Sequence, residues 1–112
     1  MPVERIERGE VYWVNFDPSI GGEIQKTRPA IVISNNSANA ALNRVQVIPI
    51  TSKVDRLYPG EALIELRGEK RKAMATQIAT VSKIRLGDKL GKIGSQDLEA
   101  VVSAIITQLA LK

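Results

Sequence analysis

Short apolar runs, each closed by turn-forming residues, alternate with polar stretches over most of the chain. The runs are rich in Val, Ile and aromatic residues, and Gly, Pro, Asn, Asp or Ser stands at their ends, which is typical of strands. The expected strands cover residues 11–16, 29–34, 44–52, 62–66, 73–81 and 89–93. Only the C-terminal stretch has apolar residues at helical spacing. Several short strands and one terminal helix predict a mainly β fold, a small antiparallel barrel with short helical additions.

The expected helix starts at Gly94 and Ser95, where Ser95 is a suitable N-cap and Asp97 suits the positive end of the helix dipole. Its apolar face consists of Leu98, Val101, Val102, Ile105, Ile106 and Leu109. The opposite side carries no charge and consists of Ala100, Ser103, Ala104 and Thr107. Because a solvated helix face is normally charged, we expect a second contact for this side, with either the rest of the barrel or another subunit.

Other stretches have weaker local signals. Residues 35–43 contain good capping residues, but their length allows only one or two helical turns. Pro49 interrupts a strand-like run, which favours a sheet edge or a bulge because proline cannot donate to a ladder. The charged residues 67–72, with Gly68 at their centre, are either a solvated hairpin tip or a phosphate site. Gln77 is expected on the outer face of a strand.

A basic, proline-terminated segment stands before the second expected strand. Residues 19–27 form a polar loop with a Gly pair, and Lys26-Thr27-Arg28-Pro29 follows at its end. Pro29 fits the first strand position or an edge, and the residue before a proline is pushed out of the α region, so Arg28 should be extended at the strand entrance. Arg28 is then either a solvated loop-end charge or a ligand for a phosphate, which suits its forked guanidinium.

Composition narrows the possible chemistry. The 112 residues are expected to form one domain, residues 1–112, and 16 basic against 12 acidic residues give a net charge of +4. That balance is compatible with a polyanionic partner. Cys and His are both absent, which excludes thiolate chemistry and the commonest general base, and we expect no metal site and no cofactor. The charged N-terminus has no apolar leader and no run is long enough to span a bilayer, so we expect a cytoplasmic protein without membrane contact.

Seven stretches match a family pattern in order and spacing. They are RGEVYWV at residues 8–14, GE at 22–23, KTRPAIVISN at 26–35, VIPITS at 47–52, QIATV at 77–81, RL at 85–86 and LGKI at 90–93. On these residues the chain resembles the MazF/PemK-like (Kid-like) toxins of bacterial type II toxin–antitoxin pairs. The resemblance covers nearly the whole chain. It implies an SH3-like barrel, a homodimer, and sequence-selective cleavage of single-stranded RNA without a metal or cofactor.

The resemblance also implies site residues and partners. It makes Arg28 and Thr51 the catalytic pair. It assigns RNA contacts to Glu23, Lys26, Thr27, Ser52 and Gln77. The implied partners are single-stranded RNA, a second copy of the chain, and an antitoxin whose acidic, disordered tail lies across the RNA groove. Two departures concern RNA contacts, because many members have Ser where Ala73 stands and Arg or Lys where Ala79 stands.

The implied reaction is attack of a ribose 2′-hydroxyl on the adjacent phosphorus, which leaves a 2′,3′-cyclic phosphate and a 5′-hydroxyl. Arg28 suits the charge that gathers on the phosphoryl oxygens, and Thr51 suits a neutral donor. From the residues alone, Thr51 is equally a hydroxyl that caps a strand end. The general base stays open between Arg28, although a guanidinium is a poor base, and Glu23, which is otherwise a solvated loop carboxylate. Trp13, Tyr12 and Phe16 are expected in the core or an interface.

Two other classes of function stay open at this point. One is a barrel that has lost its chemistry and binds only RNA or its antitoxin. The other is a toxin on the same barrel that poisons a topoisomerase, and the presence of both Arg28 and Thr51 argues against it. A small adaptor module is the third and least specific alternative.

Overall fold

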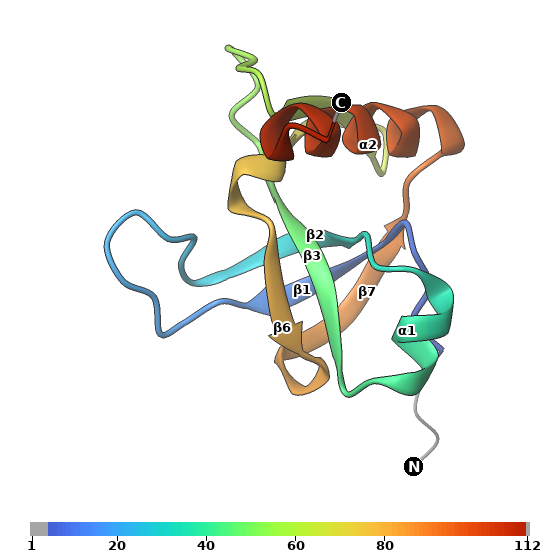
Figure 1. The fold of residues 1–112 in the computed structure, drawn as a ribbon. Coiled ribbons are helices and arrows are strands. Elements are labelled where there is room, and N and C mark those ends of the chain that lie inside the picture. Colours follow the sequence, from blue (N-terminus) through green and yellow to red (C-terminus); the bar gives the residue numbers. More distant parts are fainter. Residues whose placement is uncertain (1–4, 112) are drawn as a thin grey trace.

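The computed structural model describes residues 5–111, so residues 1–4 and 112 of the expected domain lie outside the described part. The strands are β1 (Glu10–Asn15), β2 (Thr27–Val32), β3 (Arg44–Thr51), β4 (Glu61–Leu66), β5 (Glu69–Met74), β6 (Ala79–Ser82) and β7 (Leu86–Lys92). The helices are α1 (Asn36–Ala41) and α2 (Ser95–Leu109), and two 3-10 turns, η1 (Ala75–Gln77) and η2 (Lys83–Arg85), flank β6. Figure 1 shows a curled sheet with α2 packed across one end and the β1–β2 loop extending away from the body.

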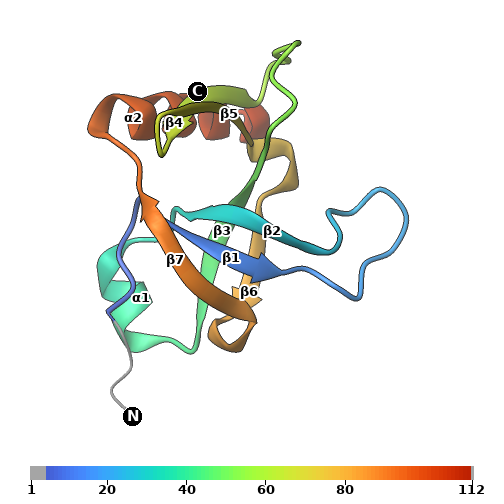
Figure 2. The ribbon, with the colours of Figure 1, turned by 180° about the vertical axis from the view of Figure 1, so that it is seen from behind.

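The strands form one antiparallel sheet in the order β4-β5-β3-β2-β1-β7, and β6 pairs with β3 beside this path. The sheet curls into a half-barrel, and Figure 2 shows the β4–β5 hairpin lying beside α2. The prediction of a mainly β, antiparallel barrel-like fold with short helical additions and a C-terminal helix is confirmed.

The central strands have apolar side chains on both faces, because successive strand residues point to opposite sides of a sheet. In β3, Ile48 belongs to a core cluster that α2 and the β4–β5 hairpin cover, whereas Val47 belongs to a second cluster inside the curl of the sheet. Ile31 and Val32 divide in the same way in β2. Burying such side chains is worth about 1.5–3 kcal/mol each, so the double-sided strands hold the two clusters together.

The C-terminal helix lies as predicted, but its contact face is rotated. Val101 and Ala104 are buried in the α2-covered cluster and Ala100 packs against it, so part of the uncharged side contacts the rest of the domain. Leu109, expected on the core face, is 48% exposed. The N-cap is Gly94, without a side-chain hydrogen bond, and the predicted cap at Ser95 is therefore wrong.

The expected strand over residues 73–81 is interrupted. The 3-10 turn η1 separates β5 from β6, and this break lets both strands pair with β3, with β6 reaching Val47 and β5 starting at Ile50. Pro49 is fully buried and lies between the part of β3 that pairs with β6 and the part that pairs with β5. The predicted sheet edge or bulge at Pro49 is therefore wrong, and the proline marks a change of pairing partner within a central strand. Within residues 5–111, no helix is long and apolar enough to cross a membrane.

Glu10 is buried where β1 meets β7, and three donors surround its carboxylate. Lys89 Nζ pairs with Oε2, while the Tyr12 hydroxyl (2.8 Å) and the Glu7 backbone N–H (2.7 Å) donate to Oε1. Burial alone would raise the pKa of Glu10, but the hydrogen bonds from Lys89, Glu7 and Tyr12 outweigh it and lower the pKa below its ordinary value.

This lowered pKa makes the stabilisation by Glu10 dependent on pH. It is fully present above the unfolded-state pKa of about 4.3 and is lost as the pH falls through the lower folded-state pKa. We expect Glu10→Gln to lower the free energy of unfolding at pH 7 by about 1–3 kcal/mol, and the difference from the wild type to shrink below about pH 4. Urea titrations between pH 3 and pH 7 measure both quantities. A difference that stays constant with pH would show that the charge of Glu10 contributes nothing.

Candidate active site

A cavity of about 320 Å³ opens where β2 begins and β3 ends. It is lined by Trp13, Thr27, Arg28, Pro29, Ile50, Thr51, Ser52, Lys53 and Arg71. Three of these residues are cations, three have hydroxyl groups, and none of the described lining residues is acidic. We call it the Arg28 cavity. Its walls offer positive charge and hydrogen-bond donors, the combination that binds anions such as phosphate.

The backbone just before β2 fixes where Arg28 starts. Lys26 has a left-handed φ of 68°, its N–H donates to Asp17 Oδ1 (2.8 Å), and its carbonyl oxygen accepts from the Phe16 N–H (2.9 Å). These bonds close the β1–β2 loop immediately before the strand. Arg28 then follows in extended backbone, as predicted, and its Nε donates to the Gln25 carbonyl oxygen (3.0 Å). Among residues 5–111 this is the only hydrogen bond of the Arg28 side chain, so both Nη groups remain for an anion.

Thr51 is the last residue of β3, and the strand delivers its hydroxyl to the Arg28 cavity. Thr51 Oγ1 accepts a hydrogen bond from the Lys53 N–H (3.2 Å), which is the strand-end capping anticipated from the sequence. A hydroxyl that accepts still has its own proton to donate. Capping the strand end is therefore compatible with donating a hydrogen bond to a ligand in the cavity.

A buried lysine holds down the loop that contains Lys53. Lys72 in β5 is 7% exposed; its Nζ lies 3.0 Å from Glu61 Oε1 and donates to the Arg56 carbonyl oxygen (2.9 Å). The same Glu61 oxygen accepts from the Tyr58 N–H (2.8 Å). Breaking a buried ion pair by removing one partner typically costs about 3–5 kcal/mol, because the other charge is left unpaired. The pair therefore anchors the β3–β4 loop beside the end of β3.

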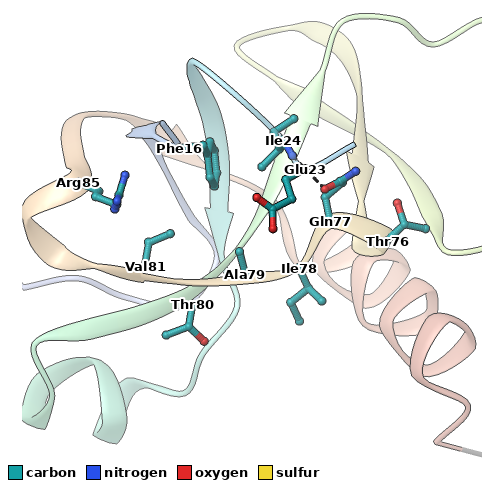
Figure 3. Close-up of a pocket in the computed structure, with 10 residues that line it drawn as sticks. All are labelled: Phe16, Glu23, Ile24, Thr76, Gln77, Ile78, Ala79, Thr80, Val81 and Arg85. Carbon is teal, nitrogen blue, oxygen red and sulfur yellow. Dashed lines mark hydrogen bonds between the residues drawn. The ribbon is translucent and has the colours of Figure 1, made fainter. Parts of the chain in front are cut away.

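A second cavity, of about 310 Å³, lies between the β1–β2 loop and β6 (Figure 3). It is lined by Phe16, Glu23, Ile24, Thr76, Gln77, Ile78, Ala79, Thr80, Val81 and Arg85. We call it the Gln77 cavity. Gln77 Oε1 accepts from the Ile24 N–H and Gln77 Nε2 donates to the Gly22 carbonyl oxygen, both at 3.2 Å. Gln77 lies in the turn η1, so its predicted place on a strand face is wrong, and its amide ties the loop to that turn.

The predicted site residues therefore divide between two cavities. Thr27, Arg28, Thr51 and Ser52 line the Arg28 cavity, while Glu23 and Gln77 line the Gln77 cavity. Lys26 lies on the backbone that leads into β2. The Glu23 carboxylate accepts from the Ile20 N–H (2.8 Å) within its own loop. Of the two departures from the family pattern, Ala79 lines the Gln77 cavity and Ala73 is buried in the core.

Five lining residues of the Arg28 cavity were not predicted as site residues: Trp13, Lys53, Arg71 and the apolar Pro29 and Ile50. Trp13 was expected in the core or an interface, yet it is 39% exposed, while Tyr12 and Phe16 are buried. Strand alternation indicates that one of two neighbouring aromatics faces outward, but not which one. The hairpin turn consists of Arg67 and Gly68 alone, and Arg71 belongs to β5. The prediction of a solvated hairpin tip over residues 67–72 is therefore wrong for Arg71.

Comparisons with known proteins agree with this geometry. The model of a family described as PemK-like, MazF-like toxin of type II toxin–antitoxin system matches residues 7–109. The chain is 32% identical to the endoribonuclease MazF9 of Mycobacterium tuberculosis over 115 aligned positions, which cover 95% of this chain and 98% of the relative. It is 30% identical to the endoribonuclease EndoA of Bacillus subtilis, with 95% and 96% covered.

Solved structures share the fold. A crystal structure of MazF from Deinococcus radiodurans superposes with a TM-score of 0.85 at 24% identity, over 96% of this chain and 99% of the other. A mycobacterial endoribonuclease in complex with its cognate antitoxin superposes with a TM-score of 0.80, also at 24% identity, over 96% and 97% of the two chains. The half-barrel with its terminal helix is thus a known arrangement.

Proposed function

The chain belongs to the family of PemK-like, MazF-like toxins of type II toxin–antitoxin systems, and we propose that it cleaves single-stranded RNA at the Arg28 cavity. The observation that carries the proposal is the meeting of Arg28 and Thr51 in one cavity, from the start of β2 and the end of β3. The full-length relatives in M. tuberculosis and B. subtilis are named endoribonucleases, which favours a nuclease over a topoisomerase poison or a binding-only barrel.

The reaction that fits these groups is a transesterification within the RNA. The 2′-oxygen forms a bond to the adjacent phosphorus, and the bond from phosphorus to the 5′-oxygen breaks. The 2′-hydroxyl loses its proton in this step, and the leaving 5′-oxygen gains one. Negative charge grows on the phosphoryl oxygens during this step. Arg28 stabilises it through paired charged hydrogen bonds and Thr51 adds a neutral donor. Losing one such preorganised donor costs roughly 2.7–4 kcal/mol, at least a hundredfold in rate.

The lining of the cavity favours charge stabilisation over proton transfer as the protein's main contribution. A guanidinium stays protonated in proteins and is therefore a poor base. Glu23, the other candidate base, lines the Gln77 cavity and caps its own loop. Positive charge comes from Arg28, Lys53 and Arg71, which leads us to propose that cleavage needs no metal or cofactor.

The proposed partners follow from the same charges. Single-stranded RNA is the substrate, and an antitoxin with an acidic, disordered tail inhibits the enzyme by covering the cations of the Arg28 cavity, since opposite potentials attract across an interface. Complexes of related toxins with a cognate antitoxin support this proposal. We also propose a cytoplasmic location, because the proposed RNA substrate is found there.

Replacing Arg28 tests the catalytic assignment. Arg28→Lys keeps the charge but loses the guanidinium fork, so we expect cleavage to fall at least a hundredfold while the thermal unfolding midpoint stays near that of the wild type. Arg44→Lys, at the exposed start of β3, is the matched control and should cut normally. Initial rates on a long single-stranded RNA measure the effect. Near wild-type cleavage by Arg28→Lys would overturn the assignment.

The nucleophile is tested with an RNA that has a single 2′-deoxy nucleotide directly 5′ of the cut. In chelator, the unmodified RNA should be cut and the modified bond should stay intact. The modified strand should still bind and inhibit competitively, because one hydroxyl contributes only about 0.5–1.5 kcal/mol as a net hydrogen bond.

The two halves of this experiment fail separately. Continued cleavage at the deoxy position would mean that water is the nucleophile, while the protein would remain a nuclease. Activity that disappears in chelator and returns with magnesium or manganese would contradict metal-free catalysis.

We also propose that the enzyme is a homodimer. Ile106 on α2 is only half-buried, Leu109 is 48% exposed, and Leu63 on the adjoining β4 is 43% exposed. A two-fold axis near these side chains would cover the same apolar surface on both subunits. Sedimentation equilibrium at concentrations well above micromolar should give twice the chain mass of 12.2 kDa, and Ile106→Glu should shift the equilibrium toward monomer. A wild type that stays monomeric throughout would rule the dimer out.

A further inference from the structure

The Arg28 cavity contains more positive charge than one phosphate needs. Arg28 and Thr51 together supply the forked cation and the neutral donor for a single phosphoryl group. Lys53, from the β3–β4 loop, and Arg71, from β5, line the same cavity from other elements. None of the described lining residues is acidic, and Glu69, which pairs with Arg71, lies outside the lining. A strand of RNA, with one charge per nucleotide, is the ligand class whose charge repeats at short intervals.

The contacts that hold Arg71 leave its guanidinium available for binding a phosphate. Its Nη1 donates to the Lys70 carbonyl oxygen (2.9 Å), and its Nη2 lies 2.7 Å from Glu69 Oε1. Among the described residues these are its only partners, and both belong to its own strand. The Glu69 side chain is 68% exposed, and an exposed pair of this kind is worth at most about 1 kcal/mol. An incoming phosphate can therefore replace Glu69 at little cost, and the remaining N–H groups of the guanidinium are already free to bind it.

We propose that Arg71, assisted by Lys53, binds a second RNA phosphate that flanks the one held by Arg28. The inference rests on the proposed function of the cavity. The volume of about 320 Å³ lies at the lower end of the range for small-ligand sites, which suits a nucleotide-sized group between two phosphates. Trp13 also lines the cavity and is 39% exposed, and an aromatic ring is a suitable partner for stacking of the intervening base. Arg71 thus sets affinity and register along the strand, and Arg28 performs the chemistry.

Salt dependence distinguishes a phosphate contact from a general loss of charge. The probe is an RNA oligonucleotide made uncleavable by a single 2′-deoxy nucleotide at the cut, and its dissociation constant is measured at several salt concentrations. Arg71→Gln should weaken binding at low salt and reduce the slope of log K against log salt by about 0.7, the value for one phosphate on a single strand. Lys70→Gln removes the same charge from the neighbouring exposed position of β5, outside the cavity lining, and should leave the slope unchanged.

A scan of neutral linkages identifies the phosphate. Oligonucleotides with one methylphosphonate at successive positions should each be measured with the wild type and with Arg71→Gln. At one linkage next to the cut, the methylphosphonate should weaken binding by the wild type. It should not weaken binding by Arg71→Gln any further, because the two changes remove the same contact. Additive losses at every linkage, or an unchanged salt slope in Arg71→Gln, would overturn the inference.

The outcomes separate this inference from the proposed function. If the wild type cuts unmodified RNA and Arg71→Gln keeps the full slope, only the second phosphate site is wrong. If the wild type binds the oligonucleotide with the expected Arg71 dependence but cuts nothing, the proposed catalysis is wrong and the phosphate site stands. If the wild type neither binds nor cuts RNA, both are wrong.

Discussion

The structure depends on β3 pairing with three other strands. β2 pairs along one edge, while β6 and β5 share the other edge in succession, with Pro49 at the point where the partner changes. A proline without an N–H is least costly where no ladder bond is required of it. β3 also packs against a core cluster on each of its two faces, so contacts on both edges and both faces fix its position. Thr51 gains its place in the cavity from this constraint, because it is the residue on which β3 ends.

The ion pair between Lys72 and Glu61 neutralises a buried positive charge beside the end of β3. Lys72 lies opposite Thr51 in the pairing of β3 with β5, close to the cations of the Arg28 cavity. Unpaired, its buried charge would be strongly unfavourable and would repel them. Glu61 neutralises it, and the shared contacts to Arg56 and Tyr58 tie down the loop after Thr51. The positive charges that remain for a ligand are therefore those that line the cavity, on Arg28, Lys53 and Arg71.

Local patterns predicted most of the fold, because they record burial and turn chemistry directly. The β-branched runs gave the strands, Pro29 placed Arg28 at the start of β2, and the helical spacing gave α2. The errors concern features set by distant partners. Residues 73–81 contain no Gly or Pro that would interrupt a strand, yet the chain breaks at η1 because β5 and β6 must reach different parts of β3. The contribution of Arg71 to the Arg28 cavity depends on the same pairing, so the charge cluster at residues 67–72 left a hairpin tip and a phosphate site as alternatives and did not indicate that Arg71 reaches this cavity.

The β1–β2 loop connects the two halves of the site. Gln77 holds the second half of the loop at Gly22 and Ile24, and directly after them the bonds of Lys26 fix the start of β2 and hence Arg28. The Arg28 cavity, rich in cations, suits the RNA backbone, which is alike in every sequence. The Gln77 cavity, with amide, hydroxyl and carboxylate groups, suits the edges of splayed bases. Ala79, where many family members have a cation, lines the Gln77 cavity alone, so under the proposed function this departure concerns the choice of RNA sequence and not the groups proposed to stabilise the cleaved phosphate.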